Sequence, residues 1–293
     1  MGDKGWRTHP SETLHVSPGF SVEGFDHDST PGWKGGEDEA VEEMTRRGKD
    51  LYDLQERLFA EAKTAGGTRS VLLVLQGMDT AGKGGIVGNV VGMVSPYGTQ
   101  VRAFGAPTEE ERKHHYLWRI ENSLPLPGRI AVFDRSHYEQ VLVVRVENIE
   151  PPEVWGTHYD EINAFEARVA ETGTTIVKCA LMVSPEEQLR RLEDRLEDPS
   201  KYWKYNPKDI DKRENWDAYM AAYQDIFTRC STELAPWHAI PADKKWYARL
   251  AITELLTTAL EGLNPAWPPA DFDVEAEKAR VAALQGRSVP QER

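Results

Sequence analysis

Short runs of apolar, often β-branched residues alternate along the chain with longer stretches in which apolar residues recur every three or four positions. The short runs are typical of buried strands, and the longer stretches are typical of amphipathic helices. Five strands are predicted, at residues 71–75, 99–104, 129–133, 174–183 and 237–240. Because strands that alternate with helices form parallel sheets, we predict an α/β fold in which a five-stranded parallel sheet has helices on both faces.

Helices are predicted at residues 37–65, 84–94, 109–122, 136–148, 153–171, 215–234 and 243–260. One more begins at Ser184 and Pro185, which form a helix cap and first turn. Residues 1–36 lack periodicity and are rich in Gly, Pro, Ser and His, so we expect an extended or loosely packed arm. We expect residues 37–269 to form the main domain and residues 270–293 to form a charged, partly helical tail.

A glycine-rich turn joins the first predicted strand to the helix at 84–94. Gly77, Gly82 and Lys83 satisfy the pattern G-x-x-x-x-G-K. Glycines let main-chain N–H groups curl around phosphate oxygens, while the helix N-terminus and the lysine add positive charge. The sequence therefore predicts a phosphate-binding loop, with an ordinary glycine-rich turn as the alternative. The expected phosphate-binding residues are Gly77, Met78, Thr80, Ala81, Gly82, Lys83, Gly84 and Gly85.

Two carboxylates are candidate Mg²⁺ ligands. Gly84 occupies the position at which such loops usually carry a metal-binding Ser or Thr, and Asp79 lies inside the loop as another oxygen ligand. Asp134 ends the strand at 129–133, where parallel sheets bind ligands and where the Walker B aspartate lies. Arg135 follows it and would face the same phosphates. We expect Asp79 and Asp134 to hold Mg²⁺, with Mn²⁺ as a substitute.

A long polar segment near residues 190–213 is expected to form a lid. Arg190, Arg191 and Arg195 precede a loop in which Lys204 and other cations alternate with aromatic residues. In small-molecule phosphotransferases, a mobile lid with arginines closes over the phosphates, excludes water and neutralises transition-state charge. A solvated surface loop is the alternative interpretation.

Two other polar groups have less specific patterns. His114, His115 and Arg119 cluster on a predicted helix, but no third ligand accompanies the histidines, so a polar surface is favoured over a metal site. Glu139 and Arg145 lie beyond Asp134, and an intrahelical or interhelical ion pair of these residues is as consistent with the sequence as a role in the site.

Composition excludes several classes of protein. The formal net charge of −13 argues against a non-specific nucleic-acid binder, although a local basic groove could still bind a polyanion. The apolar runs are too short for a transmembrane helix, and the N-terminus lacks the apolar core of a secretory signal. Cys179 and Cys230 have no metal-type or redox-type partner, so we expect buried thiols in a reducing cytoplasm.

The chain resembles the polyphosphate kinase 2 family, a branch of P-loop kinases with a fold like thymidylate kinase. The resemblance covers roughly residues 38–268 and rests on GMDTAGKGG (77–85), PTEEERKHHYLWR (107–119), FDRSHYEQVLVVRV (133–146), YDEINAFE (159–166), RLEDPSKYWKYNP (195–207) and STELAPWHAIPADKKWYARL (231–250). The RSHYE form is similar to that of the subgroup that phosphorylates both nucleoside monophosphates and diphosphates.

The resemblance implies reversible phosphoryl transfer between inorganic polyphosphate and nucleotides, from AMP to ADP and from ADP to ATP, by a homodimer or homotetramer. The implied catalytic residues are Asp79, Lys83, Asp134, Arg135, Arg191 and Arg195, with His115, Arg119 and Lys204 as candidate substrate-binding residues. Gly84 agrees with the family, which also lacks the usual hydroxyl. Val144 stands where other subgroups carry an acid, which leaves the role of Glu139 open.

Other functions remain to be distinguished. An ATP-dependent nucleoside monophosphate kinase would use the same loop and lid, without polyphosphate. A guanine-nucleotide switch is disfavoured because the chain has no N-K-x-D motif, and a scaffold with a degenerate loop is disfavoured by Lys83, Asp134 and the lid arginines. For direct in-line transfer the attacking phosphate is already anionic, so positioning and charge neutralisation are expected to suffice without a strong general base.

Overall fold

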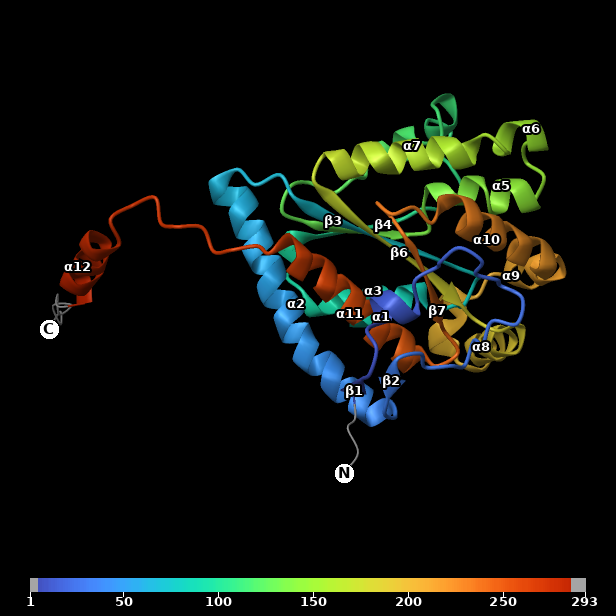
Figure 1. Cartoon of the computed structure of the whole chain (residues 1–293), viewed down its shortest axis with the longest axis horizontal. Helices are drawn as coiled ribbons and strands as arrows, with labels where there is room; N and C mark the ends of the chain where they lie inside the picture. Colours follow the sequence, from blue (N-terminus) through green and yellow to red (C-terminus); the bar gives the residue numbers. More distant parts are fainter. Residues whose placement is uncertain (1–4, 286–293) are drawn as a thin grey trace, which may run out of the picture.

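A twisted five-stranded parallel sheet forms the centre of the molecule (Figure 1). The structure is a computed structural model that describes residues 5–285. The strands are β3 (Ser70–Gly77), β4 (Thr99–Ala103), β5 (Ile130–Asp134), β6 (Thr174–Met182) and β7 (Trp237–Pro241). Their spatial order is β4-β5-β3-β6-β7, and each neighbouring pair is parallel. The predicted α/β class, strand number and direction are therefore confirmed.

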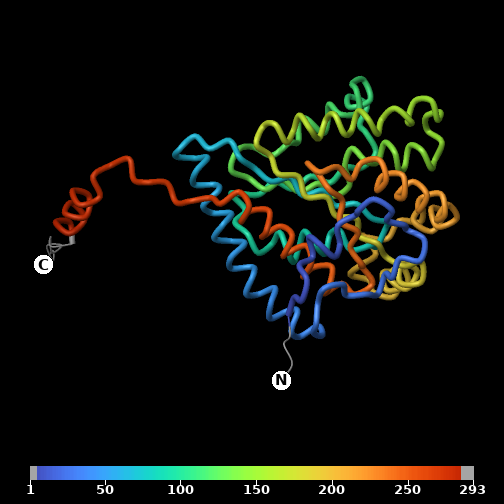
Figure 2. Tube along the Cα trace, in the orientation of Figure 1, coloured from blue at the N-terminus to red at the C-terminus, as the bar shows by residue number. Residues whose placement is uncertain are grey.

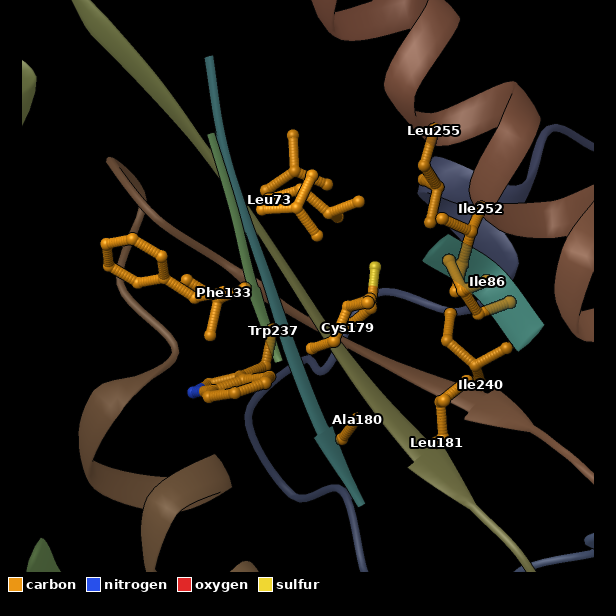
Figure 3. Close-up of a cluster of buried hydrophobic side chains, with 14 of the residues drawn as sticks. Leu73, Ile86, Phe133, Cys179, Ala180, Leu181, Trp237, Ile240, Ile252 and Leu255 are labelled. Carbon is orange, nitrogen blue, oxygen red and sulfur yellow. The ribbon is translucent and has the colours of Figure 1, made fainter. Parts of the chain in front are cut away.

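Helices cover both faces of this sheet (Figure 1). One face packs against α2 (Glu37–Ala65), α3 (Lys83–Asn89) and α11 (Lys245–Leu263), and the other against α7 (His158–Glu171) and α10 (Trp216–Cys230). Figure 3 shows Ile86, Ile252 and Leu255 on one side of the strands and Phe133 and Trp237 on the other. Since both faces are covered, β3 is apolar along nearly its whole length, which explains why the sequence shows a continuous apolar run there.

Several predicted helices are shorter or interrupted. Residues 109–122 form a 3-10 turn (Glu111–Lys113) and a short α4 (Trp118–Glu121), because His114 between them is extended. Residues 136–148 form a 3-10 turn (His137–Gln140) and a short α5 (Val143–Val146), separated by the irregular backbone of Leu142. Helix α3 ends at Asn89, and a 3-10 turn (Val91–Met93) follows in a stretch that contains Gly88 and Gly92.

The region after β6 contains the remaining elements of the expected lid. Helix α8 (Pro185–Glu197) begins as predicted, with the Ser184 side chain accepting a hydrogen bond from the Glu187 N–H. A 3-10 turn (Pro199–Lys204), α9 (Lys208–Asp211) and another 3-10 turn (Lys212–Asn215) lead into α10. The helix predicted at 153–171 is divided by a turn at residues 156 and 157 into α6 (Pro152–Trp155) and α7, and the helix predicted at 215–234 ends at Cys230.

The N-terminal segment has little regular secondary structure, and part of it packs against the domain. It contains β1 (Gly5–Trp6), α1 (Pro10–Thr13) and β2 (Trp33–Lys34). Leu14 and Val16 are buried, and their main chains hydrogen-bond to the main chain of β7 at Ala239 and Trp237. Further along, the segment crosses α10, where Gln224 bonds the main chain of residues 20 and 22 (Figure 2). The few apolar residues in this stretch were too widely spaced to show a period.

The C-terminal tail is partly helical, as expected, and stands away from the body of the molecule (Figure 1). Its helix is α12 (Val274–Gln285). No helix in residues 5–285 combines the length and apolarity needed to cross a bilayer. Cys179 and Cys230 are buried free thiols, which confirms the prediction of their burial.

Candidate active site

The glycine-rich loop connects the end of β3 to the start of α3, as a phosphate-binding loop requires. Gly77 has φ +156°, and a Cβ there would lie 2.8 Å from the Leu181 carbonyl oxygen of β6. Gly82 has φ +116°, and Thr80 adopts the left-handed region although it carries a side chain. A residue with a side chain adopts such a conformation at a cost in free energy, and these conformations are common at ligand-binding sites. The loop therefore holds one specific main-chain shape.

Lys83 lies inside the loop and is buried. Its Nζ donates to the Gly77 carbonyl at 2.8 Å and to the Met78 carbonyl at 3.3 Å. Burial lowers the pKa of Lys83, while the neighbouring carboxylates of Asp134 and Asp79 act to raise it. The ammonium group is thereby held at the centre of the loop, where it can bind an anion.

Asp79 is held between two cations. Arg135 Nη2 lies 2.6 Å from Asp79 Oδ1, and Lys212 Nζ lies 3.1 Å from Oδ2. Burial by itself raises the pKa of Asp79, but Lys83, Arg135 and Lys212 outweigh it and lower that pKa to about 2. Arg135 also has a left-handed backbone, with φ +63°. The two predicted residues therefore meet, and Lys212 of the lid segment joins them.

Asp134 and Glu139 complete the acidic side of the site. Asp134 is the last residue of β5 and pairs in register with Leu75 of β3, which places it at the carboxyl end of the sheet beside the loop. Glu139 accepts a hydrogen bond from Gln76 Nε2 at 2.9 Å. A narrow cavity of about 30 Å³ is lined by Gly77, Met78, Asp79, Arg135, Glu139, Leu142, Val143, Lys212, Tyr219 and Tyr223.

Glu139 and Arg145 have different partners in the structure. Arg145 forms an ion pair with Asp225 of α10, with Nη1 2.5 Å from Oδ2, and it bonds the Tyr159 hydroxyl at 2.9 Å, so the predicted ion pair is confirmed for Arg145 with a partner on another helix. Its guanidinium also lies over the Trp155 ring. Glu139 lines the cavity with Asp79 and Arg135 instead.

Arg191 lies behind the loop, almost completely buried. Its Nη1 donates to the carbonyls of Thr80 and Ala81 at 3.0 and 3.1 Å. Its Nη2 donates to the carbonyls of Ala242 and Asp243 at 2.6 and 3.0 Å, beyond the end of β7. Its Nε bonds Glu187 at 2.7 Å, so every N–H of the guanidinium has a partner in the protein. In this structure Arg191 ties the loop to β7, and its expected contact with phosphate stays a prediction.

A larger cationic cavity, of about 350 Å³, opens beside the loop. Arg195 borders it from α8 and donates to the Lys204 carbonyl at 2.8 Å. Lys245 and Arg249 border it from α11, one helical turn apart. The charged lining consists of Arg191, Arg195, Lys201, Lys204, Lys245 and Arg249, together with the carboxylate of Asp194. The cavity therefore suits a strongly anionic ligand.

His115 and Arg119 lie outside both of these cavities. His115 Nε2 is 3.3 Å from Glu161 Oε2, and Arg119 Nη1 donates to the Gly105 carbonyl at 2.9 Å. Their expected contact with substrate stays a prediction. Within residues 5–285 no group of three His, Cys, Asp or Glu side chains is arranged to hold a metal.

Sequence reasoning missed Lys212, Lys245 and Arg249 as specific site residues. Lys212 was only one cation among several in the lid segment, and nothing in its neighbours distinguishes it. Lys245 and Arg249 did carry a signal, because two basic residues four positions apart at the start of a helix lie on one face of it.

Known proteins that are similar to this chain show its family. The model of the family described as Polyphosphate kinase 2 (PPK2) matches residues 36–267. The chain belongs to the polyphosphate kinase 2 family. A crystal structure of Polyphosphate Kinase 2 from Arthrobacter aurescens TC1 superposes with a TM-score of 0.91 at 50% sequence identity, over 96% of this chain and 100% of that one.

Two relatives have more specific names. The AMP/ADP-polyphosphate phosphotransferase of Meiothermus ruber is 43% identical over 249 residues, which is 85% of this chain and 91% of the relative. The ADP-polyphosphate phosphotransferase of Rhodopseudomonas palustris is 39% identical over 230 residues, 74% of this chain and 78% of the relative. The family membership and P-loop kinase fold expected from the sequence are thus confirmed.

Proposed function

We propose that this chain transfers phosphoryl groups reversibly between inorganic polyphosphate and nucleotides, converting AMP to ADP and ADP to ATP. The observation that carries the proposal is the cationic cavity beside the phosphate-binding loop, because its basic lining extends beyond the loop to Lys245 and Arg249 of α11 and to Lys201 of the lid segment. A polymer of phosphates would use charges spaced in this way. The names of the two relatives support the same reaction.

The chain's own residues provide positioning and charge neutralisation. Lys83 and the main-chain N–H groups of the loop bind the transferred phosphate, and Arg135 approaches from the end of β5. Arg195 and Lys204 add charge from the lid side. Because the attacking nucleotide oxygen is already anionic, no side chain has to remove a proton.

The donor set fits Mg²⁺, which usually binds through one or two carboxylates together with substrate phosphates and water. Asp134 would serve as one such carboxylate, because no protein hydrogen bond to its side chain occurs among residues 5–285. Asp79 would serve as the second after exchanging Lys212, which now pairs with it. The bound ion would neutralise further phosphate charge. Mn²⁺ has the same preference for oxygen ligands.

A donor comparison tests the proposal against an ATP-dependent nucleoside monophosphate kinase. Purified protein is given AMP with either long-chain polyphosphate or ATP, and ADP formation is followed. We expect turnover with polyphosphate, and turnover with ATP alone would contradict the proposal.

A matched pair of variants tests the cavity. Lys245→Met removes a cation that lines it, whereas Lys244→Met removes the adjacent cation, which bonds Asp28 outside it. We expect the KM for polyphosphate to rise at least about fivefold in Lys245→Met only, since one lost phosphate contact costs roughly 1 kcal/mol or more. Equal KM values in the two variants would exclude the cavity as the polyphosphate site.

Assembly and compartment complete the proposal. We infer a homodimer or homotetramer in the cytoplasm, with polyphosphate and nucleotides rather than nucleic acid or membrane as partners. The buried free thiols and the net charge of −13 support these assignments.

A further inference from the structure

A cluster of buried polar side chains lies beneath the turn that follows β5. Glu166 of α7 and Lys178 of β6 form an ion pair with Nζ 2.5 Å from Oε2, and both are almost completely excluded from solvent. The Tyr138 hydroxyl donates to Glu166 Oε1 at 2.9 Å and accepts from Lys178 Nζ at 2.7 Å. His137 Nε2 lies 3.1 Å from the same Glu166 oxygen. The third donor of Lys178 bonds the Cys230 carbonyl at the end of α10, at 2.7 Å.

The bonding pattern defines the protonation of this cluster. Burial raises the pKa of Glu166, but Lys178 and His137 outweigh it, so that pKa lies below its ordinary value. An ionised carboxylate only accepts hydrogen bonds, so His137 donates from Nε2. The Nδ1 atom of His137 has no hydrogen-bond partner among residues 5–285. Each N–H of the Lys178 ammonium group therefore has an acceptor, and the Glu166 carboxylate accepts three hydrogen bonds.

The turn itself faces in two directions. Ser136, His137 and Tyr138 are buried on the side of the cluster. Arg135, before them, bonds Asp79, and Glu139, after them, bonds Gln76 and lines the cavity beside the loop. In residues 135–139, the first and the last therefore face the site, and the three between them face the core.

This turn also needs support from outside. Arg135 has φ +63°, a conformation that non-glycine residues rarely adopt and that persists only where the surroundings enforce it. The 3-10 turn His137–Gln140 is short and is followed by irregular backbone at Leu142. The turn makes local hydrogen bonds, from the Tyr138 N–H to Ser136 Oγ and from the Glu139 N–H to the Ser136 carbonyl, and side-chain anchors from α7, β6 and α10 add to them.

We propose that Glu166, Lys178 and Tyr138 are positioning residues that hold the 135–139 turn in the geometry needed for phosphoryl transfer. The carboxylate of Glu166 fixes His137 and Tyr138, and Lys178 fixes the carboxylate. Those two residues in turn aim Arg135 and Glu139 at the phosphate-binding loop. The inference rests on the proposed function for the identity of the reaction and on the contacts above for the positioning.

The first test compares two buried tyrosines. Tyr138→Phe removes the hydroxyl that joins Glu166 to Lys178. Tyr247→Phe removes an equally buried hydroxyl that donates to the Pro31 carbonyl, away from the turn. We expect kcat to fall about tenfold in Tyr138→Phe, with KM for both substrates within about twofold, because misplaced catalytic groups slow the chemical step more than they weaken binding. Tyr247→Phe should keep the wild-type kcat.

Amide hydrogen exchange gives a second readout that does not depend on activity. Exchange in residues 135–142 should accelerate in Tyr138→Phe and stay unchanged in Tyr247→Phe. Unchanged kcat together with unchanged exchange in Tyr138→Phe would overturn the inference. The kcat is measured with whichever phosphate donor the wild type uses. If the proposed function is wrong, the wild type will not use polyphosphate. If the inference is wrong, the kcat of the variant will equal that of the wild type with the donor that it does use.

A paired replacement separates positioning from stability. Lys178→Met alone leaves Glu166 as an unpaired buried charge and should lower the melting temperature strongly. Combining Lys178→Met with Glu166→Leu removes both charges and should restore much of that temperature. We expect the double variant to remain at least about tenfold below wild type in kcat. A double variant that regains both stability and full kcat would show that the cluster acts on stability alone; if it does not fold, the comparison of the two tyrosine variants decides.

Discussion

Replacing Arg191 by methionine should destabilise the whole domain, even though this residue lies where a lid arginine was expected. The guanidinium is buried and donates to the four carbonyls of Thr80, Ala81, Ala242 and Asp243. The first two belong to the phosphate-binding loop and the last two follow β7. Methionine can fill much of the same space but bonds none of these oxygens.

The expected loss follows from these contacts. Four hydrogen bonds from a charged donor, at about 1.5 kcal/mol each, would contribute roughly 6 kcal/mol. Removing the buried guanidinium also removes its desolvation cost, which offsets part of that loss. We therefore expect the free energy of unfolding to fall by about 3–5 kcal/mol in Arg191→Met.

Arg190 offers a control on the adjacent position. Its side chain is 53% exposed and pairs with Glu187 and Asp194 on the surface. Arg190→Met should change the free energy of unfolding by less than about 1 kcal/mol. Urea unfolding of both variants, together with kcat, measures the difference. If Arg191→Met unfolds within about 1 kcal/mol of wild type but loses most of its kcat, the guanidinium acts on the phosphates and the structural argument is refuted.

Three further changes have defined outcomes. Asp134→Asn should lower kcat at least about 100-fold with the free energy of unfolding within about 1 kcal/mol of wild type, and activity within a few-fold would exclude its role. Gly77→Ala should lower the free energy of unfolding in urea by about 2–4 kcal/mol, because its Cβ would lie 2.8 Å from a carbonyl oxygen of β6. Gly88→Ala is the control and should not lower it, because its Cβ would meet no atom of another residue within 4 Å. Burial lowers the pKa of His238 to about 4, so the unfolded chain binds the proton first as the pH falls. The free energy of unfolding of the wild type should therefore fall by up to about 3 kcal/mol between pH 6.5 and pH 4, whereas that of His238→Gln should not show this fall. Equal dependence of the free energy of unfolding on pH in the two proteins would contradict this prediction.

The fold was predictable because its strongest determinants are local. The apolar runs of the five strands and the glycine pattern at 77–83 are set by burial and by loop shape, and both are visible in consecutive residues. The breaks at 114 and 142 were not visible, because neither position carries a proline or a glycine. The packing of the N-terminal segment against β7 depends on partners more than 200 residues away.

The sequence predicted most of the charged residues of the site, but it did not predict which residues they bond. Asp79, Lys83 and Arg135 meet as expected because each is placed by a strand end or by the loop. Lys212 bonds Asp79, which lies 133 positions earlier in the chain. A sequence pattern does not show which residues so far apart will be in contact. Arg191 shows the same limit, since its type and position suggested phosphate while its contacts in the structure are with main-chain oxygens.

The most direct test of the proposed function is a product assay. Purified wild-type protein is incubated with Mg²⁺ and long-chain polyphosphate, with AMP, ADP, GMP and GDP offered in turn, and the nucleotides are separated by chromatography. We predict that AMP yields ADP first and then ATP, and that ADP yields ATP directly. No product from polyphosphate with any acceptor, alongside turnover of AMP when ATP is the donor, would contradict the account.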